Sequence, residues 1–394
     1  MGSKTSKSKR PGSVETKAVV VPVVPKTEQD SRVPQEIIDE ILDHLVVGLG
    51  SEPKSLETTL RSCSLVSKSW VPSCRRHLFH AVYFNVTYMK RWVKTFPVPE
   101  ESPAHHVRDL CLLPGRYYDA PEFFERTQWF TNAKKMTVFG DVPLSSWLGI
   151  PSFAKLPQTV TSLTIRARTV DLVQMRDVIA RLPNLDDLSL SGSVTKRGRS
   201  FLGLGTTLRA RFGGKLQLRG GHPYGKVVDM LLEVPTGLHF TEVHVYTNRG
   251  CLPTTVRLAE ACGETLVRLL YGCLYNDDSE TFERSFDFSK SRSLREVTFN
   301  LHWIYNDLHW IHMALSTLKP ATTPHLSSIY LSFKDPGYLS RPSSAQLEKN
   351  PNDLQGVADE FVRIGREYDG EVDITVVLDT GHRLLGIYNV RFCF

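Results

Sequence analysis

The chain has 394 residues, of which 41% are hydrophobic and 10% aromatic, enough to bury a large core in two or three domains. Its formal net charge is +6, but residues 1–32 supply +4 of this, with seven Lys or Arg against three acidic residues. The rest of the chain is nearly neutral. No nucleic-acid partner is therefore expected from charge.

The sequence also disfavours a membrane-spanning protein and a secreted protein stabilised by disulfides. No apolar stretch approaches about 18 residues, and the run Ala18–Val24 is interrupted by Pro22 and too short for a signal peptide. The seven cysteines are an odd number without CxxC spacing, which favours free thiols in a reducing compartment. We expect a cytoplasmic and/or nuclear protein with no membrane partner, cofactor or metal.

Residues 1–31 are rich in Lys, Ser, Thr, Val and Pro and show no periodicity, which predicts a disordered basic tail that folding does not require. The basic piece Lys4–Arg10 is compatible with a nuclear import signal, although a solvated tail is the simpler interpretation.

Three short helices are predicted next. The first begins near Pro34 and has apolar residues at helical spacing: Ile37, Ile38, Ile41, Leu42 and Leu45. A loop marked by Gly48, Gly50 and Pro53 follows it. The second starts near Leu56 and carries Leu60 and Cys63 on one stripe. The third starts near Pro72, with Cys74, Leu78 and Val82 at spacing four.

The segment Val33–Leu45 resembles the opening of an F-box, and Cys63–Trp70 with Arg75–Phe79 resembles its second half. The Val-Ser-x-x-Trp element at Val66–Trp70 is the most specific part. Val33 replaces the usual Leu before the proline, and the first loop is somewhat long.

The resemblance, to F-box proteins of the fungal type with degenerate leucine-rich repeats, implies a partner. F-box modules bind a Skp-type adaptor and through it a cullin, while the rest of the chain selects a target protein. The matching positions either contact the adaptor or form the core of the module: Pro34, Ile37, Ile38, Ile41, Leu42, Leu65, Val66 and Trp70.

An apolar-x-x-apolar-x-apolar unit recurs through residues 107–331 at steps of 25–28 residues, with a last step of 32. Its last two apolar positions are Leu110/Leu112, Met136/Val138, Leu163/Ile165, Leu188/Leu190, Leu216/Leu218, Val243/Val245, Leu269/Tyr271, Val297/Phe299 and Ile329/Leu331. Helices are predicted between the units, the clearest at Leu172–Leu182 and Ile304–Leu318.

A strand and a helix at this period resemble leucine-rich repeats, although the Asn or Cys expected after each strand is not regular. The predicted fold class is α/β: an N-terminal three-helix F-box module followed by a leucine-rich-repeat-like solenoid with parallel inner strands and outer helices. We expect a basic tail over 1–31, the F-box over 32–82, the array over 104–333, and a polar loop with a C-terminal cap over 334–394. A helix at Leu354–Ile364 and a strand at Val372–Leu378 would form the cap.

Side chains between the core positions of each strand should line the inner face of the array. A basic stretch with neighbouring ring side chains predicts the target site there: Arg166, Lys215, Arg219, His244, Tyr246 and Arg268. Such a surface favours an acidic or phosphorylated target segment. A solvated strand face without a partner is the alternative.

The sequence signals for nucleotide binding, metal binding and catalysis are weaker. Gly220-x4-Gly225-Lys226 resembles a phosphate-binding loop, but Val227 replaces the hydroxyl residue that would bind magnesium. The set Cys63, Cys74, His77 and His80 lacks zinc spacing. Trp303 and Trp310 suit outer packing or a partner contact. No nucleophile elbow, kinase signature or RING-like cysteine series occurs, so the chain is expected to be non-catalytic.

Three hypotheses follow. The first is the substrate-receptor subunit of a cullin–F-box (SCF-type) ubiquitin ligase. The second is a repeat-based protein-binding scaffold that acts without the ligase. The third, a nucleotide hydrolase, depends only on the defective glycine loop.

Overall fold

The computed structural model describes residues 33–49, 53–113, 129–140, 159–195, 208, 210–220, 224–247, 252–273, 285–302, 308–334, 351–379 and 384–390. The expected tail 1–31, Trp303 and residues 335–350 of the expected polar loop lie outside these ranges. No helix in the described ranges is long and apolar enough to cross a membrane.

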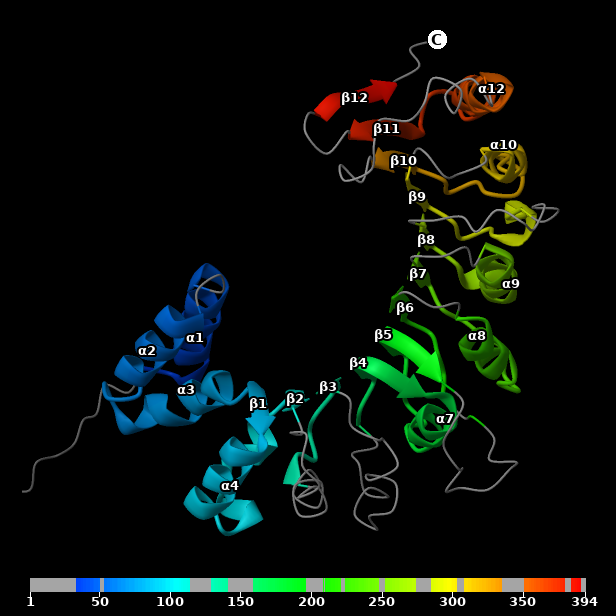
Figure 1. Ribbon diagram of the computed structural model, residues 1–394. Coiled ribbons are helices and arrows are strands. Elements are labelled where there is room, and N and C mark those ends of the chain that lie inside the picture. Colours follow the sequence, from blue (N-terminus) through cyan, green and yellow to red (C-terminus); the bar gives the residue numbers. More distant parts are fainter. Residues whose placement is uncertain are drawn as a thin grey trace, which may run out of the picture.

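Within the described ranges, a sheet of 12 strands organises the chain, and its strands lie side by side in sequence order (Figure 1). Neighbouring strands are parallel from β1 to β11, and only the final pair is antiparallel. The bounds are β1 Ala81–Asn85, β2 Asp109–Leu113, β3 Lys135–Phe139, β4 Ser162–Asp171, β5 Asp187–Thr195, β6 Lys215–Gly220, β7 Glu242–Thr247, β8 Arg268–Cys273, β9 Glu296–His302, β10 Ser328–Lys334, β11 Asp373–Asp379 and β12 Leu384–Val390.

Helices stack along the outer side of this sheet, one after another (Figure 1). They are α7 Leu172–Ala180, α8 Gly225–Leu232, α9 Leu252–Cys262, α10 His309–Ser316 and α12 Pro351–Glu367. Short 3-10 turns lie at Pro99–Glu101 (η2), Pro103–His106 (η3), Gly263–Thr265 (η6) and Phe288–Lys290 (η7). The architecture is therefore an α/β solenoid-like stack of strand-and-helix layers, as the repeat period predicts.

All nine predicted repeat units lie on strands, β2 to β10. Their core positions stand in register across the sheet, for example Leu163 beside Leu188 and Leu188 beside Leu216. The two strand positions of each unit are at most 2% exposed and belong to one continuous core. A strand period of two explains this, because alternate side chains of each strand point to the helix layer.

The N-terminal end of the array differs from the sequence prediction. The third helix ends at Leu78, and Val82 lies on β1, where it packs against the main core together with buried Phe84. Strand β1 is followed directly by a further helix, α4 Val86–Thr95. The alternating apolar residues Val82 and Phe84 fit a strand. The prediction that Val82 continues the third helix, four residues after Leu78, was wrong.

At the C-terminal end, the predicted helix and strand are confirmed as α12 and β11. The strand is not the last one, since β12 pairs with β11 in the antiparallel direction. Helix α12 packs on α10, where Arg363 donates to the carbonyl oxygens of Leu315 and Leu318 at 2.9 and 3.1 Å. This contact satisfies two acceptors at the end of α10 and joins the cap to the array.

Three helices precede the sheet: α1 Gln35–Leu49, α2 Pro53–Cys63 and α3 Val71–Leu78, with a 3-10 turn, η1, at Lys68–Trp70. We call residues 33–78 the helical module. Its own small core consists of Ile38, Leu42, Leu60 and Cys74, each at most 1% exposed. Module and array therefore have separate cores.

Along the chain, Phe79 and His80 separate the module from β1, and α3 also contacts η3. Phe79 packs edge-on against Trp92 of α4 with 5.7 Å between ring centroids. The His80 carbonyl oxygen accepts from the backbone N–H groups of Arg108 (2.8 Å) and Asp109 (3.0 Å). These contacts fix the direction in which α3 runs into β1.

Candidate functional site

The first candidate site is the apolar surface of the helical module. Ile37 and Ile41 are 45% and 40% exposed, although Ile38 and Leu42, one position further along α1, are fully buried. Leu65 and Val66, in the turn before η1, are 87% and 67% exposed. Helix α1 contacts η1, which begins two residues after Val66.

The structure thus divides the residues that the F-box resemblance left together. Ile38 and Leu42 form the core of the module, and Trp70 is half-buried against it. Pro34, Ile37, Ile41, Leu65 and Val66 are exposed. We call Ile37, Ile41, Leu65 and Val66 the docking residues.

The exposed apolar side chains are concentrated in this part of the molecule. Of the nine large hydrophobic residues that are exposed within the described ranges, five belong to the module: the docking residues and Val33. A gathering of exposed apolar side chains on a small unit is typical of a protein-binding surface. A module whose buried core holds four residues also gains stability when a partner covers its surface.

Polar contacts hold α1 against α3. Asp39 accepts hydrogen bonds from Gln35 (3.1 Å), Ser73 and Arg76 (3.2 Å), and the Ser73 hydroxyl is the main reason why the pKa of Asp39 lies below its usual value. Arg76 and His77 also lie 3.3 and 3.1 Å from Asp43. These bonds orient α1, and with it Ile37 and Ile41.

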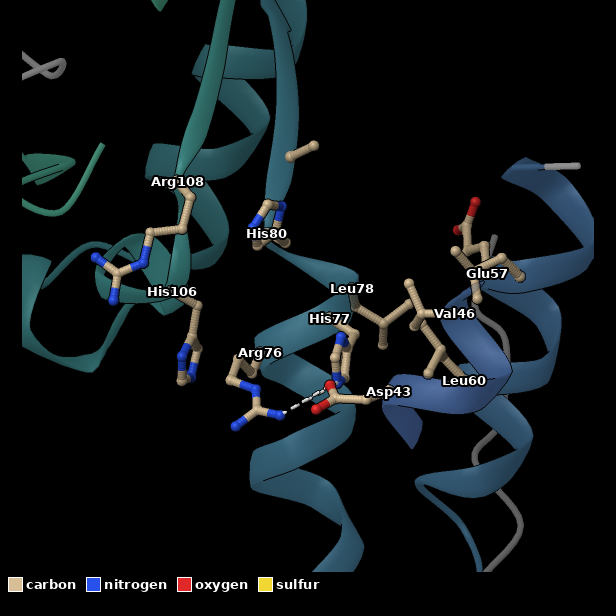
Figure 2. A pocket seen from close by; sticks show the side chains of 12 residues that line it. Asp43, Val46, Glu57, Leu60, Arg76, His77, Leu78, His80, His106 and Arg108 are labelled. Carbon is tan, nitrogen blue, oxygen red and sulfur yellow. Dashed lines mark hydrogen bonds and ion pairs between the residues drawn. The ribbon is translucent and has the colours of Figure 1, made fainter. Parts of the chain in front are cut away.

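A cavity of about 830 Å³ lies where the module meets the array (Figure 2). Val46, Leu60 and Leu78 lie on one side together with Glu57, and His80, His106 and Arg108 lie on the array side, with Asp43, Arg76 and His77 between them. Burial is the main reason why the pKa of His77 and that of His106 lie below their usual value. Arg76 adds to the decrease at His77, where Asp43 opposes it, and His105 adds to the decrease at His106. No group of three or more His, Cys, Asp or Glu side chains suited to a metal ion occurs among the described residues.

The second candidate site is the inner face of the sheet. Three rows of side chains cross it, because equivalent residues of neighbouring strands are in register. The lower row contains Lys215, Glu242, Arg268 and Glu296; the middle row contains Ser189, Gln217, His244 and Leu270; the upper row contains Phe139, Arg166, Ser191, Arg219, Tyr246 and Gly272. The six residues expected at the target site are therefore split among three rows.

Charges alternate along the lower row. Lys215 lies 3.3 Å from Glu242, and Arg268 bonds to Glu242 (3.4 Å) and to Glu296 (2.9 Å). The hydrogen bond with Glu296 raises the pKa of Arg268, and the same bond lowers the pKa of Glu296. Lys215 and Arg268 are thus neutralised in place. The basic stretch on the inner face therefore contains fewer free positive charges than the sequence predicted.

His244 lies in the middle row and is largely buried. Burial lowers its pKa to about 4, the Lys215 ammonium adds to the decrease, and the Glu242 carboxylate opposes it. Its Nε2 is 3.5 Å from Glu242 and makes no hydrogen bond. His244 is therefore a neutral, desolvated group at neutral pH and contributes no positive charge to the face.

Arg166 and Arg219 remain as the exposed cations of the upper row. Neither forms an ion pair with an acidic residue among those the structure describes. Arg166 stacks over Phe139 at 5.5 Å from the ring centroid. With the Gln217 amide oriented to donate to Ser189, its oxygen accepts from the Arg219 guanidinium at 2.8 and 3.0 Å.

The sequence reasoning missed the first part of the inner face. A hollow of about 210 Å³ lies over β1 to β3 and is lined by Ala81, Val82, Tyr83, Asp109, Leu110, Cys111, Lys135 and Thr137. Tyr83 is half-exposed and lies 6.5 Å from Phe139, centroid to centroid. The alternation of Val82 and Phe84 was the signal that places Tyr83 on this face.

Two weaker sequence features also have a place in the structure. Gly225 and Lys226 begin α8, while Gly220 ends β6 and residues 221–223 lie outside the described ranges. Trp310 is 2% exposed and packs edge-on against Phe299 and Tyr271 at 5.2 and 5.6 Å. It is thus part of the main core.

No protein-family model matches the chain, and no curated protein is significantly similar to it in sequence.

Proposed function

We propose that the protein is an F-box substrate-receptor subunit of a cullin–F-box (SCF-type) ubiquitin ligase. The helical module would dock onto a Skp-type adaptor, and through it onto a cullin. The leucine-rich-repeat-like array would hold the target protein on its inner face. The observation that carries the proposal is the separation of buried Ile38 and Leu42 from exposed Ile37, Ile41, Leu65 and Val66.

The connection between module and array supports this division of labour. The Phe79–Trp92 contact and the two hydrogen bonds to the His80 carbonyl anchor the residues between module and array to the first layers of the array. A receptor of this kind is not itself catalytic. It raises the local concentration of a target lysine near a conjugating enzyme, which requires a fixed geometry between its two binding surfaces. The compartment would be cytoplasmic and/or nuclear.

The test is capture of a Skp-type adaptor by the full chain after co-expression. Ile37→Asp with Ile41→Asp should reduce adaptor binding at least tenfold, because the complex would bury two unpaired carboxylates. Both side chains are at least 40% exposed in the free chain, so the change should leave the module folded. Leu42→Asp is unsuitable, since a charge at a fully buried position would unfold the module.

A matched control places the same charges on exposed apolar residues elsewhere. Val98 and Met313 are 40% and 44% exposed and lie outside the module. Val98→Asp with Met313→Asp should bind the adaptor like the unchanged chain. If the Ile37/Ile41 variant keeps its circular dichroism spectrum and still binds the adaptor undiminished, the assignment fails. A scaffold that acts without the ligase then becomes the better explanation.

A further inference from the structure

The two arginines of the upper row stand at a defined spacing. Arg166 pairs with Ser191 across β4 and β5, and Ser191 pairs with Arg219 across β5 and β6. Neighbouring strands are about 4.8 Å apart, so the two arginine backbones are roughly 9.6 Å apart. Ser191 is the only side chain between them in this row.

Each guanidinium is held by a neighbour, and both arginine residues are exposed. Phe139 supports Arg166 from the preceding strand, and a cation stacked on a ring keeps its N–H groups directed outward in the guanidinium plane. Arg219 is braced by the Gln217 amide oxygen. Prior ordering of both side chains lowers the entropy cost of binding an anion.

An aromatic ring lies flat at the next position of the row. Tyr246 follows Arg219 in the register, and its ring occupies the space above Gly272 on β8. A Cβ atom added at Gly272 would lie 2.3 Å from the Tyr246 ring. Gly272 therefore lets the ring lie against the sheet. The row reads aromatic, cation, hydroxyl, cation, aromatic.

We propose that this row binds an acidic segment of the target in the polyproline II conformation, with carboxylates at positions i and i+3. A polyproline II helix has three residues per turn and rises about 3.1 Å per residue, so such carboxylates share one face and stand roughly 9.3 Å apart. That distance matches the arginine spacing. An apolar residue that flanks the acidic pair on the Arg219 side would lie on Tyr246, as proline-rich segments do on aromatic-lined grooves, while Phe139 supports Arg166.

At positions i and i+3, charge balance favours two carboxylates over two phosphoryl groups. Each guanidinium carries one positive charge and meets one carboxylate with its planar pair of donors. A phosphoryl group carries close to two negative charges at pH 7, and the lower row offers no spare cation, because Glu242 and Glu296 neutralise Lys215 and Arg268. The inference rests on the proposed use of the inner face for target binding, but not on adaptor docking.

The test uses the full chain and labelled peptides of eight residues, measured by fluorescence anisotropy. Pro-Pro-Glu-Pro-Pro-Glu-Pro-Pro should bind about tenfold more tightly than the same peptide with Gln in place of Glu, and also than one with adjacent glutamates. Arg166→Gln and Arg219→Gln should each weaken binding of the first peptide about tenfold. Gly272→Ala, which displaces the Tyr246 ring without changing charge, should weaken it severalfold.

Lys215→Gln is the matched control, since it removes the same charge from the same face while Glu242 keeps Arg268 as a partner. It should change peptide affinity less than twofold. Equal loss with Lys215→Gln and Arg219→Gln would overturn the proposal in favour of unspecific attraction. Tighter binding of a phosphoserine peptide by more than tenfold would overturn the choice of carboxylates. Absence of binding to any of these peptides refutes the inference without touching adaptor capture, which tests the proposed function separately.

Discussion

Acidification should destabilise the array through His244. In the folded chain burial holds the pKa of this imidazole at about 4, while its ordinary value is 6.5. Lys215, Arg268 and Arg219 oppose protonation, and Glu242 alone favours it. The side chain is 13% exposed, so solvent screens these effects little. The perturbation is therefore a pH decrease from 7.5 to 4, compared between the unchanged chain and His244→Gln.

The direction follows from proton binding. The folded-state pKa lies below the unfolded one, so between pH 6.5 and 4 the unfolded chain binds more protons and folding stability falls as pH falls. Two-state linkage with these pKa values gives a loss of about 2 kcal/mol at pH 5 and about 3 kcal/mol at pH 4. Above pH 6.5 the contribution is fully present and does not change further.

The assay is urea unfolding followed by circular dichroism at several pH values. Other titrating groups, such as His77 and His106, contribute to both proteins and cancel in the difference between them. The gap in unfolding free energy between the unchanged chain and His244→Gln should shift by about 3 kcal/mol from pH 7.5 to 4. A gap that stays constant within about 0.5 kcal/mol would show that His244 is not desolvated as described.

Two further substitutions test how the layers pack. Gly192→Ala should destabilise the fold by roughly 3 kcal/mol or more in chemical denaturation, because the new Cβ would lie 1.7 Å from the Ala167 carbonyl oxygen and Gly192 has φ +140°. Gly237→Ala, at φ +78° with no atom within 4 Å of the new Cβ, is its control and should cost only about 1 kcal/mol; equal effects would contradict the reasoning. Trp92→Ala should cost about 3–5 kcal/mol, because the ring contacts four aromatic side chains at 5.1–5.9 Å. A loss below about 1 kcal/mol would mean that the junction between module and array does not depend on this cluster.

The sequence determined the repeating layers of this protein. Alternating apolar residues recur every 25–28 positions, and each pair, such as Leu163 and Ile165, can be buried only if successive strands stack in register. Local periodicity carries this information because a strand directs alternate side chains to one side. Helix α1 could be predicted for the same reason, because the spacing of its apolar residues is also a local pattern.

The secondary structure at the two ends of the array could not be predicted from the sequence and required the tertiary structure. Strand β1 is short and only two residues separate it from α3, so Val82 fitted a helical spacing as well as a strand. Strand β12 reverses direction and pairs with β11, a choice that depends on what covers the last layer. Short segments with two or three apolar residues do not distinguish these alternatives by period alone.

Only the tertiary structure decided which candidate residues lie together, which are buried and which are neutralised by a partner. Ile38 and Ile41 are both apolar and both on α1, but packing against Leu60 and Cys74 buries the first and leaves the second exposed. Lys215 and Arg268 look like a basic surface in sequence, yet Glu242, which lies between them in the sheet, and Glu296, which follows Arg268, neutralise the pair. Residues 26–28 positions apart become neighbours when strands stack, and charge compensation across that distance has no local signature.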